Sequence, residues 1–185
     1  MTAPVVVHCP IEDPTALRQL QAGTPVRLSG TILTGRDAAH ARLHDLIREG
    51  KPLPVDFTNQ VLYYVGPAPR APGQIVGAAG PTTASRMDPY TPELLALGLR
   101  ATIGKGYRSD AVKAAMREHG AVYFGAVGGL GAILSRSIVA QRVLAFPDLG
   151  PEAIHQFEVR DFPAIVLIDA LGHDFYQQNQ AQYRQ

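Results

Sequence analysis

Three glycine-containing stretches of the sequence each place a cation just ahead of a predicted helix. They are TGRDAAH with Arg36, GPTTASRMD with Arg86 and IGKGYRSD with Lys105. Glycine lets a backbone approach a ligand closely, and a helix N-terminus adds N–H donors and partial positive charge. If the three junctions share one sheet edge, they form a pocket for a small dianion, in which arginine clamps a carboxylate bidentately. The alternative for each residue alone is an ordinary solvated loop cation.

The two threonines ahead of Arg86 allow two interpretations. Thr82 and Thr83 can simply cap a turn, which is the usual role of threonine in such a position. A hydroxyl flanked by arginine and lysine can instead take part in proton transfer, because nearby positive charge favours the alkoxide. Asp88 is expected to cap the turn or to pair with Arg86.

The histidines, the cysteine and the remaining glycines predict no metal or nucleotide site. His40 and His44 are four residues apart on a predicted helix, but no third ligand accompanies them, so a solvated helix face is favoured. Cys9 is the only cysteine, and one thiol cannot hold an iron–sulfur cluster alone. GKG and GAVGGLG lack the spacing of phosphate-binding loops, and tight helix–sheet packing explains the glycines of GAVGGLG better.

Alternating strand and helix patterns must position these residues. Strands are expected at VVVHCPI (5–11), PVRLSGTIL (25–33), VLYYVGP (61–67), QIVGAAG (74–80), ATIGKG (101–106), AVYFGAV (121–127), RVLAFP (142–147), HQFEVRD (155–161) and FPAIVLIDALGHDFY (162–176). Helices are expected at 15–21, 37–50, 91–98, 110–120 and 128–138, and Ser109 is expected to cap the fourth. In helix 37–50 the buried face should contain Ala39, Leu43, Leu46 and Ile47. This order predicts a single α/β domain with a mixed sheet, and a frayed tail at 177–185.

Length and composition narrow the class of protein further. The 185 residues are enough for one domain with a real core, and the formal net charge of +1 argues against wholesale binding of nucleic acid. No apolar run approaches the roughly 20 residues that span a bilayer, and the N-terminus lacks the basic region of a secretory signal. A cytoplasmic protein without membrane or nucleic-acid partners is therefore expected.

Four motifs together resemble a known family. GPTTASRMDPY, GKGYRSDAV, FGAVGGLGAIL and FPAIVLIDALGHDFY are similar to the C-terminal region of class I fumarate hydratases, which also occurs as the β subunit of two-subunit fumarases and L(+)-tartrate dehydratases. The resemblance runs from about residue 10 to 176. It implies a swivelling three-layer β/β/α domain and the reversible hydration of fumarate to (S)-malate. It also implies a [4Fe-4S] cluster bound by an α subunit rather than by this chain, and an α2β2 heterotetramer.

The resemblance also implies roles for individual residues. Arg36 matches a substrate-binding arginine, and Arg86 matches one that binds a substrate carboxylate. Thr82 matches the residue proposed as the catalytic base at C3. Lys105 matches the lysine that assists the carboxylate-binding arginine, so Lys105 is implied to bind the substrate as well as to take part in catalysis. No metal ligand is implied in this chain.

Other functions remain open at the level of sequence. Tartrate and methylfumarate hydratases share the scaffold, so the substrate is less certain than the class of reaction. A module that binds a dicarboxylate without turnover, and a purely structural subunit, are the two alternatives outside catalysis. The segment GAVGGLGAIL is expected to lie near the interface with the partner.

Overall fold

The strands form one mixed sheet in the computed structural model, which describes residues 3–127 and 129–183. Its strands are β1 (Val5–Cys9), β2 (Pro25–Thr34), β3 (Val61–Tyr63), β4 (Ala101–Gly104), β5 (Val122–Gly125), β6 (Ile138–Ala145) and β7 (Ile154–Ile168). The α-helices are α1 (Asp37–Arg48), α2 (Thr91–Ala96), α3 (Asp110–His119), α4 (Gly131–Leu134) and α5 (Phe175–Tyr183). Short 3₁₀ helices are η1 (Pro14–Gln19), η2 (Ala84–Met87), η3 (Ser135–Ser137) and η4 (Pro147–Glu152). The α/β class and the mixed sheet predicted from the sequence are confirmed.

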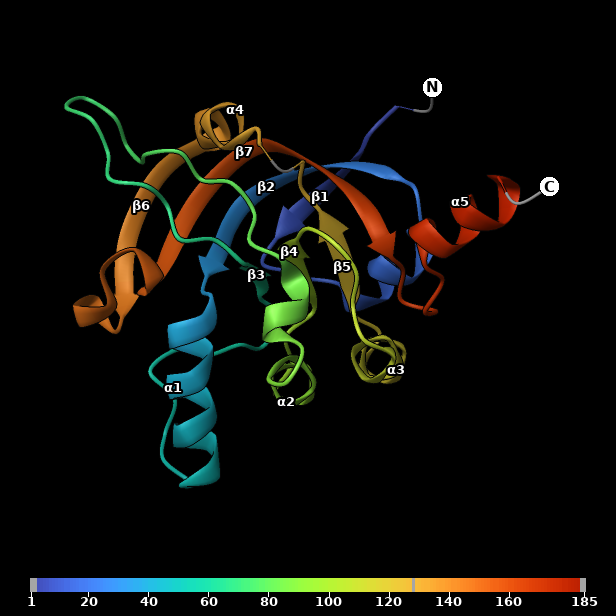
Figure 1. Ribbon diagram of the computed structural model, residues 1–185, viewed down its shortest axis with the longest axis horizontal. Helices are drawn as coiled ribbons and strands as arrows, with labels where there is room; N and C mark the ends of the chain where they lie inside the picture. The colour runs from blue at the N-terminus through green and yellow to red at the C-terminus, as the bar shows by residue number, and fades with distance from the viewer. Residues whose placement is uncertain (1–2, 128, 184–185) are drawn as a thin grey trace.

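The long strand β7 closes part of the sheet into a ring. Strands β1 to β5 are parallel neighbours in the order of the chain, whereas β7 runs antiparallel to β5. Along its other edge β7 pairs with β2. Strands β2, β3, β4, β5 and β7 therefore form a closed ring, with β1 and β6 attached at its margins. Helices α1, α2 and α3 lie together outside the ring, on the side of β3, β4 and β5 (Figure 1).

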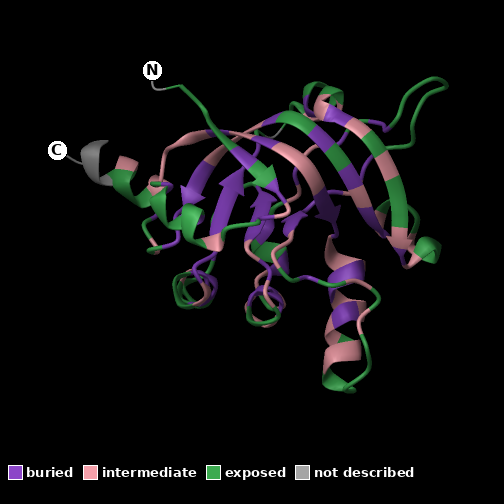
Figure 2. Ribbon diagram, turned by 180° about the vertical axis from the view of Figure 1, so that it is seen from behind, coloured by how far each residue is buried: buried purple, intermediate pink, exposed green. Residues whose placement is uncertain are grey.

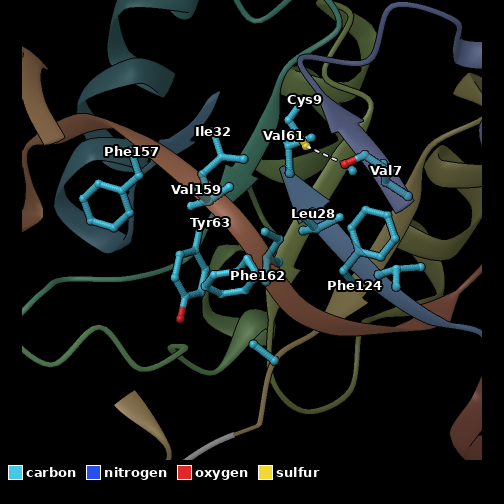
Figure 3. Close-up of a cluster of buried hydrophobic side chains, with 14 of the residues drawn as sticks. Val7, Cys9, Leu28, Ile32, Val61, Tyr63, Phe124, Phe157, Val159 and Phe162 are labelled. Carbon is cyan, nitrogen blue, oxygen red and sulfur yellow. Dashed lines mark hydrogen bonds between the residues drawn. The ribbon is translucent and has the colours of Figure 1, made fainter. Parts of the chain in front are cut away.

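Two hydrophobic clusters account for three layers. All five ring strands contribute to the inner cluster, which includes Leu28, Tyr63, Ile103, Phe124 and Phe162. Figure 3 shows part of this cluster, including Tyr63, Phe124 and Phe162. The outer cluster joins the opposite faces of the strands to the buried sides of α1, α2 and α3. Because side chains alternate along a strand, Val61 and Tyr63 point inward while Leu62 points to the helices. The layers are thus strand, strand and helix, as expected for a β/β/α domain.

Burial follows this layering (Figure 2). The strands of the ring are largely buried, whereas the loop at 70–75 and much of helix α5 are exposed. Among the described residues, no helix combines the length and the apolar character needed to cross a bilayer.

Several predicted elements differ from the structure. The segment QIVGAAG is irregular rather than a strand, because it folds back on residues 66–72: the Ala68 N–H donates to the Ala78 carbonyl, and any side chain at Gly77 would collide with the Ala68 carbonyl oxygen. The two predicted late strands form the single strand β7, which ends at Ile168. The segment that was expected to fray, 177–185, continues α5 as far as Tyr183, and residues 184–185 lie outside the described part.

Two predicted helices are shorter or tighter than expected. Of residues 15–21, only 15–19 are helical, within the 3₁₀ helix η1. The segment 128–138 is reduced to α4 followed by η3, with Gly128 outside the described residues. The glycines near α4 do permit close packing, although against other neighbours than a helix. A Cβ at Gly125 would lie 2.5 Å from Leu167 Cδ1 of β7, and one at Gly131 would lie 2.9 Å from the Gly80 nitrogen.

Candidate functional site

The segments that follow β2, β3 and β4 start at the same edge of the sheet. These strands are parallel neighbours, with Thr34 opposite Tyr63 and Tyr63 opposite Ile103. Arg36 follows the end of β2 and Lys105 follows the end of β4. In α/β proteins, ligands bind where the carboxyl ends of such strands meet. This edge is therefore the candidate site.

The turn that carries Thr82 is built into this edge by backbone hydrogen bonds. The Thr82 N–H donates to the Tyr64 carbonyl oxygen at 2.7 Å, and the Thr82 carbonyl accepts from the Lys105 N–H at 3.3 Å. The Ala84 N–H donates to the Lys105 carbonyl at 2.9 Å, so that Thr83 and Lys105 form a parallel bridge. Thr82 is half-buried and Thr83 is exposed. The backbone alone thus fixes Thr82 next to Lys105.

Gly104, the last residue of β4, makes this close approach possible. A Cβ at this position would lie 3.0 Å from both Ala84 Cβ and Tyr64 Cδ2. Contacts this short are rare, so a side chain at Gly104 would push the threonine turn away from β4. The glycine in the IGKG stretch is therefore needed for packing of the turn rather than for a phosphate loop.

Arg36 and Arg86 are joined by one carboxylate. Asp37, the first residue of α1, places Oδ1 2.9 Å from Arg86 Nε and Oδ2 3.3 Å from Arg36 Nε. Glu152 of η4 adds a second carboxylate, with Oε1 3.1 Å from Arg36 Nε. Both arginine side chains are partly exposed. The two cations, far apart in sequence, therefore belong to one ion-pair network.

The structure brings all four sequence-predicted residues to this edge, through two kinds of contact. Arg36 and Arg86 are joined through their ion pairs with Asp37, and Thr82 and Lys105 are joined by backbone hydrogen bonds. The short helix η2 connects the two pairs, because Thr82 and Arg86 are four positions apart. The Lys105 side chain is exposed, and it makes no ion pair within the described residues. The chemical role of each residue stays a prediction.

Asp88 pairs with Arg108. The sequence had suggested a pair with Arg86 instead. Arg108 Nε donates to Asp88 Oδ1 at 2.6 Å, and the Arg108 side chain has 0% exposure. The other oxygen, Asp88 Oδ2, accepts from the Ser109 N–H at 2.7 Å. The prediction that Ser109 caps the following helix is confirmed, since its side chain accepts from the Val112 N–H. Asp88 thus ties the end of η2 to the start of α3.

The other two nitrogens of Arg108 also donate hydrogen bonds within the protein. Its Nη1 donates to Thr102 Oγ1 at 3.1 Å, and its Nη2 donates to Thr91 Oγ1 at 2.7 Å and to the Tyr64 hydroxyl at 3.3 Å. The guanidinium also lies over the rings of Tyr64 and Tyr123. Arg108 therefore links η2, through Asp88, to the buried hydroxyl groups of Thr91, Thr102 and Tyr64.

Comparison with known proteins identifies the family of this chain. A sequence profile described as Fumarase C-terminus matches residues 5–179. The chain belongs to the Fumarase C-terminus family. The resemblance seen in the four motifs is confirmed by this match.

Similar proteins include both fused and separate forms of this region. The chain is 45% identical over 164 residues to "Fumarate hydratase class I, anaerobic" of Escherichia coli (strain K12), covering 88% of the chain but 30% of that protein. It is 42% identical over 167 residues to "Fumarate hydratase 2" of Leishmania major, covering 89% and 29%. It is 32% identical over 168 residues to a Methanocaldococcus jannaschii protein provisionally named L(+)-tartrate dehydratase subunit beta, covering 88% and 86%. The chain thus spans under a third of those fumarate hydratases and most of the beta subunit.

The residues of this Fumarase C-terminus domain do not fit an iron–sulfur cluster. Cys9, the only cysteine, lies in the inner cluster, where its Sγ faces the Val7 carbonyl (Figure 3). Burial raises the pKa of the Cys9 thiol to about 12, which disfavours the thiolate that binds iron. Within residues 3–127 and 129–183 there is no group of three His, Cys, Asp or Glu side chains placed to hold a metal ion. The described residues therefore offer no ligand set for such a cluster.

Asp37, Glu152 and Arg108 were not predicted from the sequence. Asp37 follows Arg36 directly, so an acid next to a candidate arginine was an available signal for the first ion pair. Nothing in the sequence connects Glu152 to Arg36, because η4 reaches the site only through the fold. Arg108 lies in a motif used for the resemblance, but its burial depends on the contacts made by Asp88 and Thr91.

The two histidines of α1 are placed differently from the predicted solvated face. His40 is 1% exposed and packs near the rings of Tyr64 and Tyr90. Its Nδ1 lies 2.8 Å from the Arg36 carbonyl, an acceptor, so Nδ1 carries the proton and donates. His44 is half-buried and its Nδ1 lies 2.9 Å from Glu93 Oε1. His40 thus replaces Leu46 and Ile47, which are only partly buried, in the fully buried face of the helix.

We expect His40 to make stability depend on pH. Burial is the main cause that lowers the pKa of His40 from 6.5 to about 4. The unfolded chain therefore binds a proton near pH 6.5 that the folded protein excludes, and stability falls as pH drops from about 6.5 to about 4. The loss from this residue alone is about 2 kcal/mol at about pH 5. Urea unfolding at about pH 6.5 and at about pH 5 measures the free energy of unfolding. Between these pH values His40→Gln should lose less of it than the wild type does. The exposed His8 provides the control: His8→Gln should keep the wild-type loss, and an unchanged loss in His40→Gln would contradict the assignment.

Proposed function

We propose that this chain is the β subunit of an iron–sulfur-dependent hydro-lyase that interconverts fumarate and (S)-malate. The observation that carries the proposal is the meeting of Arg36, Arg86 and Thr82 at one sheet edge in a domain of this family. Two guanidinium groups suit a substrate with two carboxylates, since arginine matches the geometry of a carboxylate. The curated relatives with the higher identities quoted above are named fumarate hydratases. The assignment to a β subunit is supported by the Methanocaldococcus jannaschii protein, a beta subunit of which 86% is covered by the match.

The proposed roles divide the reaction between two chains. In the dehydration direction the C3–H bond of malate breaks and Thr82 accepts or relays the proton, assisted by Lys105. The electron pair of that bond forms the C2=C3 double bond, and the hydroxyl leaves C2, so that water is lost overall. Arg36 and Arg86 hold the substrate carboxylates in place during this change. The [4Fe-4S] cluster, whose chemistry is activation of the departing hydroxyl, is assigned to the α subunit, because the residues described here do not fit one.

Exposed apolar side chains suggest where the partner binds. Val127 (61% exposed), Leu130 (39%) and Ile133 (52%) lie in the segment GAVGGLGAIL, which was expected near the interface with the partner. The Ala79 N–H donates to the Gly131 carbonyl, so this segment packs against the chain that leads into Thr82. Apolar exposure next to an incomplete site is typical of a surface that another chain covers. We propose that the α subunit covers it in an α2β2 complex. The cytoplasmic location and the swivelling motion stay predictions.

L(+)-tartrate dehydration is the second candidate. It is favoured by the archaeal relative, which has 86% of its length covered by this chain, whereas the quoted fumarate hydratases have 30% or less. Both reactions remove water from a dicarboxylate, so the same residues would carry out either. Methylfumarate hydration is a further variant of the same reaction.

We expect malate to form from fumarate only when this chain is mixed anaerobically with a reconstituted iron–sulfur α subunit from the same source. Each component alone should be inactive, because each supplies half of the site. Absorbance of fumarate measures the reaction in all three samples. A stable complex that ignores fumarate but acts on tartrate or methylfumarate would move the assignment to that substrate. A complex without turnover on any of them, in which the chain still binds dicarboxylates, would replace catalysis by binding.

A further inference from the structure

We infer that Asp37 is a positioning residue that holds Arg36 and Arg86 side by side with their outer nitrogens directed to a dicarboxylate. The inference rests on the proposed function and adds a residue to it. Asp37 gives one carboxylate oxygen to each arginine, 2.9 Å from Arg86 Nε and 3.3 Å from Arg36 Nε. A single side chain therefore spans the two proposed carboxylate clamps.

The choice of nitrogen decides what the arginines can still bind. The contacts of Asp37 and Glu152 with the two arginines are made to Nε, the inner nitrogen of the guanidinium, at 2.9–3.3 Å. Within the described part of the chain, the Nη groups of Arg36 and Arg86 donate no hydrogen bond to a protein acceptor. Each guanidinium has five donors in a rigid fork, so most of them stay available for substrate oxygens.

Asp37 is itself well placed for this task. It is the first residue of α1, where the helix dipole favours a negative charge. Its backbone position follows Arg36 directly, so the geometry of this contact is set by the start of one helix. Two neighbouring guanidinium groups repel each other, and the carboxylate between them offsets that repulsion. With the side chains already ordered, less conformational entropy is lost when a substrate binds.

Glu152 differs from Asp37 in a way that makes a graded comparison possible. It contacts Arg36 Nε and accepts from the Ala38 N–H at 3.4 Å, and it makes no ion pair with Arg86 among the described residues. Asp148, on the same helix η4, pairs with Arg42 and contacts neither clamp. Glu152→Gln should therefore disturb one arginine, and Asp148→Asn should disturb none.

The test measures the steady-state kinetics of the complex with the α subunit and the binding of succinate to the chain alone by calorimetry. Succinate is a dicarboxylate that cannot react, so its affinity reports on the clamps without turnover. We expect Asp37→Asn to raise KM for fumarate about tenfold while kcat changes less than about threefold, and to weaken succinate binding by a similar factor. Glu152→Gln should give a smaller increase, Asp148→Asn none, and Asp37→Glu should restore part of the lost affinity.

Each outcome decides between the two proposals. Unchanged or tighter binding by Asp37→Asn, with circular dichroism showing a folded protein, would overturn the positioning role and leave the hydration proposal standing. Weaker succinate binding by Asp37→Asn, in a protein whose wild-type complex hydrates none of the candidate substrates, would support Asp37 and remove the proposed reaction. A wild-type chain that binds no succinate, and whose complex is also inactive, would overturn both.

Discussion

Replacing Thr82 with alanine is expected to lower kcat of the assembled complex by about 10²- to 10⁴-fold, the usual range for the loss of a group that transfers a proton. The variant should keep its structure at the site, because the contacts that fix residue 82 are backbone hydrogen bonds to Tyr64 and Lys105. KM should change little, since the carboxylates of the substrate are assigned to Arg36 and Arg86. Anaerobic kinetics with the α subunit, together with succinate binding by the chain, separate the two effects.

The neighbouring threonine supplies a matched control. Thr83 lies in the same turn, but it is exposed, whereas Thr82 is half-buried. Thr83→Ala should retain most of the activity, and Thr82→Ser, which keeps a hydroxyl, should retain far more than Thr82→Ala. Wild-type rates in Thr82→Ala would show that Thr82 only caps its turn, which is the other interpretation that the sequence allowed. Such rates would shift the proton transfer to a residue of the partner.

The features predicted correctly are those that local sequence determines. The apolar spacing of 37–50 and its final glycine predicted α1, and Ser109 predicted the start of α3. The strand prediction for QIVGAAG was wrong, because apolar residues near glycine do not distinguish a strand from an irregular segment that folds back on residues 66–72. The pairing of β2 with β7, which closes the ring, joins residues more than 120 positions apart. No local pattern contains such a contact.

The candidate site shows the same division between local and distant information. Arg36, Arg86 and Lys105 were predicted because each sits at a glycine-containing junction ahead of a helix. Their meeting at one site could be predicted only on the condition that the three strands before them are parallel neighbours, because such strands end at one edge of the sheet. The sequence did not show which strands are neighbours. Glu152 could not be found, because its only relation to Arg36 is spatial. The burial of His40 was missed since an amphipathic helix was expected to bury aliphatic residues alone.

Replacing Arg108 with methionine is expected to destabilise the chain by about 3–5 kcal/mol, the range for removing one partner of a buried ion pair. The change leaves Asp88, whose side chain is 11% exposed, without its guanidinium. It also removes the donors that serve Thr102, Thr91 and the Tyr64 hydroxyl. Arg108→Lys should recover only part of the loss, because an ammonium cannot replace the planar fork. Urea unfolding of the isolated chain measures the free energy in each variant.

A double variant tests whether the loss comes from the uncompensated carboxylate. Asp88→Asn with Arg108→Met should cost less than the sum of the two single changes, because the buried charge is then absent. Additive effects would instead indicate that the guanidinium acts mainly through the threonines and the tyrosine rings. Asp148→Asn, in a pair exposed to solvent, should change the stability much less than Arg108→Met.

Loosening the pair of Asp88 and Arg108 should also reduce activity before it unfolds the domain. The reason is that Asp88 follows Arg86 by two residues and Arg108 follows Lys105 by three. A variant that loses stability but keeps full activity would show that the site is held by backbone pairing of Thr82 with Lys105 alone.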